Sequence, residues 1–254
     1  MVANRPMHEL DILYEDNHLL VINKPAGIAT MGAESGPTVH SLAADYLKRK
    51  YRKPGNVYVG IVSRLDAMTS GVLVLARTSK AASRLVPQFA DKNGSAAAKI
   101  YLAIVEGRID CDEGIWEDHL RKDDEARRMR VVDPSWRGAK AARLRFVTVS
   151  RSDEESTLAI QLLSGRKHQI RVQAAERGHA VLGDRKYNAR MAFPTGVALH
   201  SWRLQITHPT RRETMWFEAG LPNSWRGARA QRIDLTTLRP RLSRQFNLST
   251  DSQA

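Results

Sequence analysis

A short stretch at residues 63–71, S-R-L-D-A-M-T-S-G, places an arginine and an aspartate between two apolar runs. The run G-I-V precedes it and V-L-V-L-A follows it, so Asp66 is expected on a loop between two buried strands. A carboxylate held by rigid flanks can act as a nucleophile or as a base. An aspartate can equally close a turn by accepting hydrogen bonds from backbone amides two residues further on. The loop alone leaves both interpretations open.

A second stretch, S-G-R-K-H-Q-I-R-V at residues 164–172, follows a strand-like run and is expected to open a helix at its glycine-marked turn. It places Arg166, His168 and Arg171, three cationic or potentially cationic side chains, within six positions. Such a group can bind an anion, but the exposed start of an ordinary helix can have the same composition.

A third stretch, K-I-Y-L-A-I-V-E-G at residues 99–107, alternates in the manner of a strand. Ile100, Leu102 and Ile104 fall on one face and Tyr101 on the other. A tyrosine in a strand more often packs than reacts, so this stretch has no specific meaning by itself.

Apolar patterning predicts the elements that must position these stretches. Strands are expected at residues 19–22, 57–62, 71–76, 100–105, 143–149 and 157–163. One helix is expected after Thr38, and a second from Ser79 to about residues 93–94. The apolar face of the second helix comprises Ala82, Leu85, Val86 and Phe89. Because strands and helices do not alternate regularly, we expect an α+β fold with a mixed, mainly antiparallel sheet and flanking helices.

The chain has 254 residues, 42% of them hydrophobic, which suits one large catalytic domain or two small ones. Forty lysines and arginines exceed twenty-seven aspartates and glutamates, for a formal net charge of +13. Such an excess most often serves to attract a polyanion, so nucleic acid is the expected class of partner, although a basic protein can also lack a specific partner.

The single cysteine, Cys111, excludes an intramolecular disulfide framework and a cysteine-built zinc site, and it suits a reducing compartment. No apolar run approaches the roughly 18 residues that span a bilayer, and the N-terminus lacks the apolar segment of a signal peptide. We therefore expect a cytoplasmic protein without a membrane partner.

Two further segments stand out by composition. Residues 120–130, L-R-K-D-D-E-A-R-R-M-R, carry dense charge of both signs and are expected to form an exposed loop or a hairpin arm. Residues 236–254 offer little to bury and are predicted to form a flexible C-terminal tail after a catalytic domain at residues 1–235.

Together the three stretches resemble the pseudouridine synthases of the large-subunit ribosomal RNA type, the RluA-like family. That family has an H-R-L-D-x-x-T-S-G loop, a K-x-Y-x-x-x-V-x-G strand and a G-R-x-H-Q-I-R segment. The likeness begins at I-L-Y-E-D-N-H-L-L-V-I-N-K-P-A-G, includes V-L-G-D-R-K-Y at residues 181–187, and closes with A-L-H-S-W-R-L-Q-I-T-H-P-T at 198–210 and A-G-L-P at 219–222. It implies the pseudouridine synthase fold, with a central RNA-binding cleft.

The resemblance also implies a role for each matching residue. Asp66 matches the catalytic aspartate, Tyr101 the active-site tyrosine, and Arg171, in preference to Arg166, the arginine that pairs with the aspartate. Arg64 matches an arginine that fills the gap left when the target nucleotide leaves its stack. The implied activity is the isomerisation of specific uridines in ribosomal or transfer RNA, with no cofactor and no metal, by a monomer.

The remaining expected RNA contacts are cationic or potentially cationic side chains near these stretches or in the 120–130 segment: Lys99, Lys122, Arg127, Arg128, Arg130, Arg166 and His168. Two positions depart from the family pattern, since Ser63 and Gln173 stand where histidine is usual. Contacts to RNA or to the loop are expected to differ there. The chain before Leu10 is too short for the family's small N-terminal RNA-binding domain, so RNA selection is expected to lie in the catalytic domain.

Two other classes of protein fit the sequence less well. A non-catalytic RNA-binding or ribosome-assembly protein on the same scaffold would have no need of Asp66, Tyr101 and Arg171 together. A metal-dependent nuclease would need histidines or carboxylates clustered at ligand spacing, and the eight histidines are scattered. The enzyme interpretation is therefore preferred.

Overall fold

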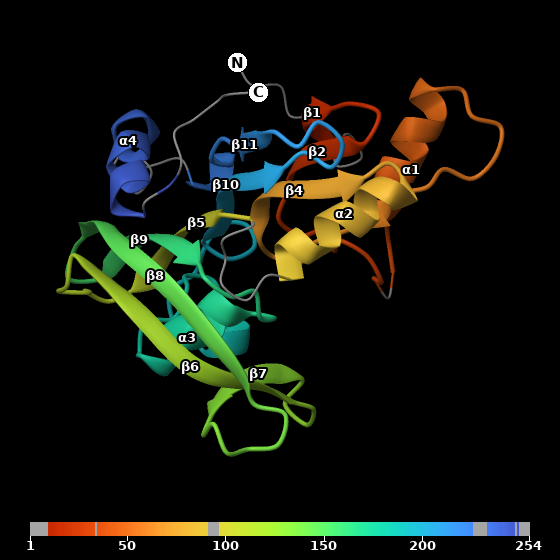
Figure 1. Cartoon of the computed structure of the whole chain (residues 1–254). Coiled ribbons are helices and arrows are strands. Elements are labelled where there is room, and N and C mark those ends of the chain that lie inside the picture. Colours follow the sequence, from red (N-terminus) through yellow and green to blue (C-terminus); the bar gives the residue numbers. More distant parts are fainter. Residues whose placement is uncertain (1–9, 34, 91–96, 226–232, 247, 249–254) are drawn as a thin grey trace.

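The computed structural model describes residues 10–33, 35–90, 97–225, 233–246 and 248. The strands are Asp11–Glu15 (β1), Leu19–Lys24 (β2), Gly60–Ile61 (β3), Ser70–Ala76 (β4), Lys99–Glu106 (β5), Glu113–Asp123 (β6), Arg128–Val132 (β7), Lys140–Arg151 (β8), Glu155–Leu162 (β9), Leu199–Thr207 (β10) and Thr214–Glu218 (β11). The helices are Val39–Lys50 (α1), Ser79–Ala90 (α2), Gln169–Glu176 (α3), Arg185–Tyr187 (η1), Asn223–Trp225 (η2) and Leu235–Gln245 (α4). Figure 1 labels most of these elements.

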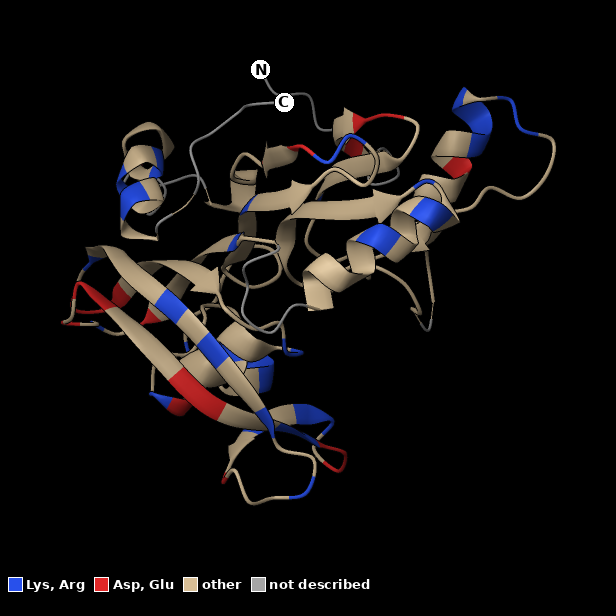
Figure 2. Ribbon diagram, viewed as in Figure 1, with Lys and Arg blue, Asp and Glu red and all other residues tan. Residues whose placement is uncertain are grey.

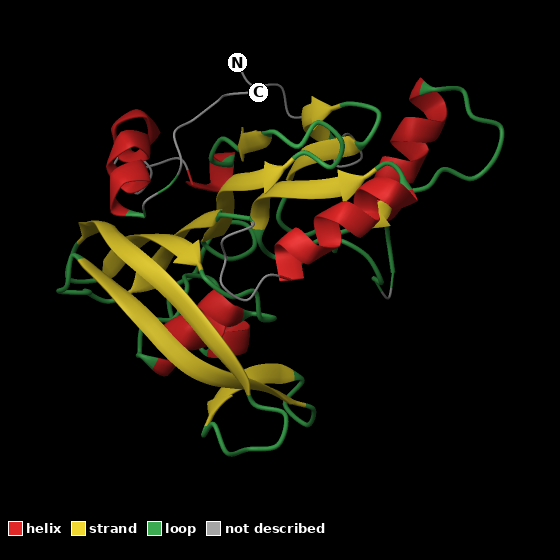
Figure 3. Cartoon of the chain, in the orientation of Figure 1, coloured by secondary structure: helices red, strands yellow, loops and turns green. Residues whose placement is uncertain are grey.

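All the described strands belong to one eleven-stranded sheet with the order β1-β2-β4-β10-β5-β9-β8-β6-β7, to which β3 adds beside β4 and β11 beside β10. The pairing of β4 with β10 is parallel, and the other described pairings are antiparallel. Figure 3 shows the helices set around this sheet. The predicted mixed, mainly antiparallel α+β fold is confirmed.

The parallel pairing of β4 with β10 joins the β1-β2-β4 part of the sheet to the part that runs from β10 to β7. Ser70 lies opposite His200 and Gly71 opposite Ser201. Gly71 has a φ of +112°, and a Cβ added to it would lie 2.2 Å from the Ser201 carbonyl oxygen. Only glycine fits both this conformation and this close approach. The glycine of the T-S-G sequence therefore serves the junction, directly after the loop that carries Asp66.

Side chains alternate along β4, so neighbouring residues of this strand pack on opposite faces of the sheet. A helix lies on each face. Val72 and Val74 pack in a cluster with Leu85 of α2. Leu73 packs in a separate cluster with Val39 of α1. The predicted apolar run is thus a strand buried on both sides, and the loop before it has a rigid support.

The two predicted N-terminal helices are present, with one difference. Thr38 caps α1 as expected, because its hydroxyl accepts from the Ser41 amide while the Ser41 hydroxyl accepts from the Thr38 amide. In α2, Leu85 is buried but Val86, expected on the same face, is 47% exposed. Residues 91–96, where this helix was expected to end, lie outside the described residues.

Two other expectations are corrected. The strand expected at residues 57–62 is only Gly60–Ile61, because only these residues pair with β4. The tail expected at residues 236–254 is wrong for α4 and its C-cap, where Leu238, Leu242 and Phe246 are buried in the largest core cluster, while residues 247 and 249–254 lie outside the described residues. These three residues recur at every fourth position, so one side of the helix is apolar.

Residues 120–130 form a hairpin, the second of the two structures expected for them. Lys122 of β6 lies opposite Met129 of β7, and the hairpin reaches the end of the molecule farthest from β1. Among the described helices, none combines the length and the apolar character needed to cross a bilayer.

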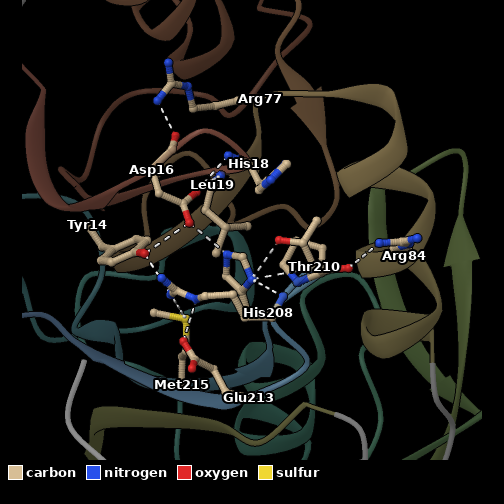
Figure 4. Close-up of polar contacts among 12 residues, drawn as sticks. Tyr14, Asp16, His18, Leu19, Arg77, Arg84, His208, Thr210, Glu213 and Met215 are labelled. Atoms are coloured by element: carbon tan, nitrogen blue, oxygen red, sulfur yellow. Dashed lines mark hydrogen bonds and ion pairs between the residues drawn. The ribbon is translucent and has the colours of Figure 1, made fainter.

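A buried histidine ties the β10–β11 turn to the β1–β2 turn (Figure 4). His208 Nδ1 accepts from the Arg211 amide at 3.0 Å, so the ring proton lies on Nε2, which donates to Asp16 Oδ2 at 2.8 Å. Asp16 Oδ1 accepts from the His18 and Leu19 amides, both at 2.7 Å. Burial alone would raise the pKa of Asp16, but these bonds together hold it below its ordinary value.

We expect Asp16→Asn to lower the free energy of unfolding at pH 7 by about 2 kcal/mol, because the amide cannot replace a charged acceptor. The lowered pKa means that the ionised carboxylate stabilises the fold above the unfolded pKa of about 3.9 and ceases to do so as pH falls through the folded pKa. The difference from wild type should therefore shrink between about pH 5 and pH 3 in urea unfolding. Asp110→Asn, at a carboxylate 85% exposed, is the control and should change little. A difference independent of pH would contradict the assignment.

Candidate active site

Seven of the predicted site residues line one pocket of about 530 Å³: Arg64, Asp66, Lys99, Tyr101, Arg166, His168 and Arg171. The pocket lies where the loop before β4, the strands β5 and β10 and the start of α3 meet. A second hollow of about 710 Å³ shares Asp66, His168 and Arg171 with it. Asp66 therefore borders two adjoining spaces.

The loop that carries Asp66 is fixed by backbone contacts on both sides of the carboxylate. The Thr30 hydroxyl donates to the Leu65 carbonyl at 2.9 Å and accepts from the Leu65 amide at 3.2 Å. The Gly27 amide donates to the Ala67 carbonyl at 2.8 Å. The turn itself is closed by the Asp66 carbonyl, which accepts from the Thr69 amide at 3.0 Å. The Asp66 side chain is thus not used to close the turn.

Lys24, at the end of β2, also holds this loop. Its ammonium donates to the carbonyls of Pro25 at 2.8 Å, Ile28 at 2.9 Å and Ala67 at 3.1 Å. Burial lowers its pKa to about 7, although the nearby charge of Asp66 acts in the opposite direction. The sequence pattern N-K-P-A-G predicted the turn but not this role of its lysine.

Arg171 joins two carboxylates in the centre of the site. Its Nε and Nη2 donate to Asp184 at 2.6 and 2.8 Å, and its Nη1 donates to Asp66 Oδ2 at 2.9 Å. Burial would lower the pKa of Arg171, but Asp184 and Asp66 together raise it above its ordinary value. The guanidinium is therefore a permanent cation, and it is Arg171 rather than Arg166 that contacts Asp66.

The two carboxylates differ in their exposure. The side chain of Asp184 is 1% exposed, whereas that of Asp66 is 24% exposed. Asp184 anchors the arginine, and the more exposed Asp66 lines the pocket. Sequence reasoning placed Asp184 within the V-L-G-D-R-K-Y stretch but assigned it no role.

His168 connects Asp66 with the hairpin. Its Nε2 lies 3.7 Å from Asp66 Oδ1, and its Nδ1 lies 2.9 Å from the Tyr187 hydroxyl, which accepts from the Met129 amide of β7 at 3.0 Å. Burial, with the charge of Arg171, lowers the pKa of His168 to about 4 despite the charge of Asp66. The lowered pKa favours a neutral imidazole in this site at pH 7.

Tyr101 lies on the face of β5 that the alternation predicted, opposite its fully buried neighbours Ile100 and Leu102. Burial raises its pKa to about 12, and the charge of Asp66 acts in the same direction, whereas a hydrogen bond with Ser201 opposes them. Its hydroxyl therefore stays protonated near neutral pH. The ring forms a wall of the pocket that also contains Asp66.

The other predicted pocket residues differ in their surroundings. Arg64 is exposed and also lines a neighbouring hollow of about 470 Å³ with Tyr58. The Arg166 guanidinium donates through Nε to the Ala141 carbonyl at 2.9 Å. Lys99 is 9% exposed and lies beside Gly165. Arg64 is thus more accessible than Lys99.

The four predicted cations of the hairpin do not line this pocket: Lys122, Arg127, Arg128 and Arg130. Lys122 pairs with Asp124, and Arg130 lies 3.6 Å from Asp123. Figure 2 shows Lys and Arg on the hairpin and also along β8 and on α1, α2 and α4. Basic residues are thus distributed over several elements of the described chain.

The two departures from the family pattern lie in different places. Ser63 lines the pocket. Gln173 is fully buried in α3, where its Nε2 donates to Asp118 Oδ2 at 2.7 Å and contacts the Trp116 carbonyl at 3.3 Å. Gln173 therefore fastens α3 to β6 and is not among the residues that line the pocket.

Comparison with known proteins places the chain among RNA-modifying enzymes. The family model described as RNA pseudouridylate synthase matches residues 18–176. The uncharacterized RNA pseudouridine synthase YhcT of Bacillus subtilis is 36% identical over 217 residues, covering 84% of this chain and 69% of that protein. The dual-specificity RNA pseudouridine synthase RluA of Haemophilus influenzae is 34% identical over 214 residues, covering 83% of this chain and 92% of that protein.

Solved structures share the fold. Human RNA pseudouridylate synthase domain containing 1 superposes with a TM-score of 0.71 at 24% identity, covering 95% of this chain and 97% of that one. Human RNA pseudouridylate synthase domain containing 4 superposes with a TM-score of 0.69 at 23% identity, covering 85% and 91%. At these identities the likeness concerns the fold, which agrees with the mixed sheet predicted from the sequence.

The unequal burial of the two carboxylates generates a stability prediction. Asp184→Asn should lower the free energy of unfolding by about 3–5 kcal/mol, because it leaves the buried guanidinium without its main partner. Asp66→Asn should lower it by about 1 kcal/mol or less, since Asp184 still holds Arg171. Urea unfolding of both variants at pH 7 measures the difference. Equal losses would show that Asp184 is not the anchor.

Proposed function

The chain belongs to the RNA pseudouridylate synthase family, and on this premise we propose that Asp66 is the residue with which it converts uridine to pseudouridine. One arrangement supports this role: the Asp66 carboxylate borders the pocket while the buried Arg171 holds it at 2.9 Å. The adjacent guanidinium favours the ionised form of a carboxylate. An ionised carboxylate in a fixed position is what a nucleophile or a base requires.

The reaction is an isomerisation within one pocket. The bond from the sugar C1′ to the uracil N1 breaks, the uracil turns, and a bond from C1′ to C5 forms. The proton that C5 loses is balanced by the proton that N1 gains, so atoms and electrons are conserved. Asp66 can act as a nucleophile that attacks the sugar or the uracil. It can alternatively act as the base that removes a sugar proton.

We assign Tyr101 to holding the uracil during this turn. Its ring can stack on the base, and its protonated hydroxyl can donate a hydrogen bond or take part in proton transfer at C5. The raised pKa of about 12 favours a neutral phenol in the resting site. Tyr101 and Asp66 thus contribute different chemistry from two separate elements of the pocket wall.

The target uridine has to leave its stack before these residues can reach it, at a cost of a few kcal/mol. Arg64 is exposed and lines the pocket, where it can occupy the space that the nucleotide vacates. The net charge of +13 favours contacts to phosphates that offset this cost. We propose ribosomal or transfer RNA as the substrate, the two targets that the sequence resemblance implies.

Asp66→Asn should reduce pseudouridine formation roughly a thousandfold or more, because it removes the charge with almost no change in volume. Affinity for RNA should stay within about threefold of wild type. Release of tritium from uracil C5 in labelled ribosomal and transfer RNA transcripts measures the reaction. Asp153→Asn, at a carboxylate 96% exposed, is the control and should keep full activity. Substantial turnover by the Asp66 variant would remove the assignment.

Arg64→Ala should leave the dissociation constant for unmodified RNA close to that of wild type but slow the single-turnover rate, since Arg64 acts after binding.

Charge reversal of Arg127 and Arg128 on the hairpin should have the opposite effect. It should weaken binding to all RNAs and flatten the salt dependence by roughly 0.7–0.9 log-log units for each phosphate interaction removed. Equilibrium binding across a salt series and single-turnover kinetics at saturating enzyme separate the two. An Arg64 variant with reduced affinity and a normal rate would contradict this division.

A further inference from the structure

One tryptophan of the chain is exposed. Trp136, in the loop between β7 and β8, keeps 47% of its surface open. The other four are buried: Trp116, Trp202, Trp216 and Trp225. Burying an indole removes a large apolar area from water. An indole that stays exposed gives up this stabilisation and therefore needs an explanation.

The loop presents Trp136 in a fixed position. Asp133 accepts from the Ser135 amide at 2.9 Å through its carboxylate and from the Trp136 amide at 3.1 Å through its carbonyl. The Trp136 carbonyl in turn accepts from the Ala139 amide at 2.9 Å. A ligand that uses this ring would therefore meet a loop that is already ordered, which reduces the entropic cost of binding.

Two guanidiniums lie against the ring. Arg121 of β6 and Arg130 of β7 face each other across the hairpin, with their Cζ atoms 5.4 and 5.0 Å from the centre of the Trp136 ring. Each distance is within the range of a cation–π contact. The hairpin thus carries an exposed aromatic surface flanked by two positive charges.

Tyr51 provides an instructive contrast. It is 42% exposed, and Lys50 and Arg77 lie over its ring at 5.7 and 4.6 Å. Glu15 accepts from all three of these side chains, so one carboxylate within the fold already bonds both cations and the ring hydroxyl. Beside Trp136, Arg130 lies 3.6 Å from Asp123, but residues 120–140 as a whole contain seven Lys and Arg against four Asp and Glu. The surface at Trp136 therefore keeps a net positive charge.

We propose that Trp136, with Arg121 and Arg130, forms a site that stacks an unpaired base of the RNA substrate outside the catalytic pocket. The inference rests on the proposed function for its choice of ligand. An aromatic face beside cations is suited to single-stranded nucleic acid, because any base can stack on the ring while the guanidiniums contact the flanking phosphates. The same hairpin donates the Met129 amide to Tyr187, which contacts His168 beside Asp66, so it is connected to the pocket.

Tryptophan fluorescence tests the stacking directly, because Trp136 is the indole open to solvent. A twelve-nucleotide oligoadenylate should quench the emission of the full chain, and the Trp136→Phe variant should lose this response. Polyphosphate of equal charge carries no bases and should leave the emission unchanged. Emission that is unaffected by saturating oligoadenylate, or equal quenching by polyphosphate, would overturn the proposal.

Affinity separates stacking from a role in stability. Trp136→Leu should bind the oligoadenylate about 5- to 150-fold more weakly, the range expected when a stacking aromatic is removed. Trp136→Phe, which keeps a ring, should recover most of the affinity. Tyr51→Leu is the matched control and should bind as wild type does. A Trp136→Leu variant that unfolds more easily but binds normally would overturn the proposal and assign the ring to the stability of the hairpin.

The Asp66→Asn variant separates this inference from the proposed function. Quenching that persists in that variant supports a base-binding site that acts without the chemistry. A chain that forms pseudouridine while its Trp136 emission is insensitive to the oligoadenylate would overturn this inference and leave the proposed function intact.

Discussion

The site depends on the buried guanidinium of Arg171. The carboxylate of Asp184 fixes this guanidinium, which in turn positions the carboxylate of Asp66. The buried Asp184 takes two of the Arg171 donors, which fixes the plane of the guanidinium and leaves Nη1 directed at Asp66. Three separate segments must be in place for this contact, namely the loop before β4, the start of α3 and the turn before η1. The arrangement of charges around Asp66 is therefore available only in the folded chain.

The sheet places these segments together through the parallel contact of β4 with β10. The sequence proximity of Asp66 to Gly71 has a structural basis, since the strand that follows the loop must approach the β10 backbone more closely than a side chain allows. Tyr101 enters from β5, the neighbour of β10 on its other side. The strand β10 thus positions both the loop and the tyrosine, which keeps Asp66 and Tyr101 in a fixed position relative to each other.

The convergence of Asp66, Tyr101 and Arg171 on one pocket could be predicted from the sequence, because each lies in a stretch that matches a motif of the family. The roles of Lys24 and Asp184 could not be, since each depends on a contact to a segment that no local pattern identifies.

Burial explains the remaining differences. The lowered pKa of His168 results mainly from burial. The polar residues next to it in the sequence gave no indication of this burial. The packing of α4 was missed although its buried residues recur at helical spacing, because Arg239, Pro240, Arg241 and Arg244 between them suggested a solvated segment.

The hairpin of β6 and β7 lies at the end of the strand order, where β7 has β6 as its partner in the described sheet. Its link to the site is made by the Met129 backbone amide, a group that every residue except proline supplies. Side chains on the hairpin can therefore be exchanged during evolution while the link to Tyr187 persists. Substitution on the outer face of the hairpin and retention of this contact beside the site are thereby separable, so variation at the sheet edge need not disturb the pocket.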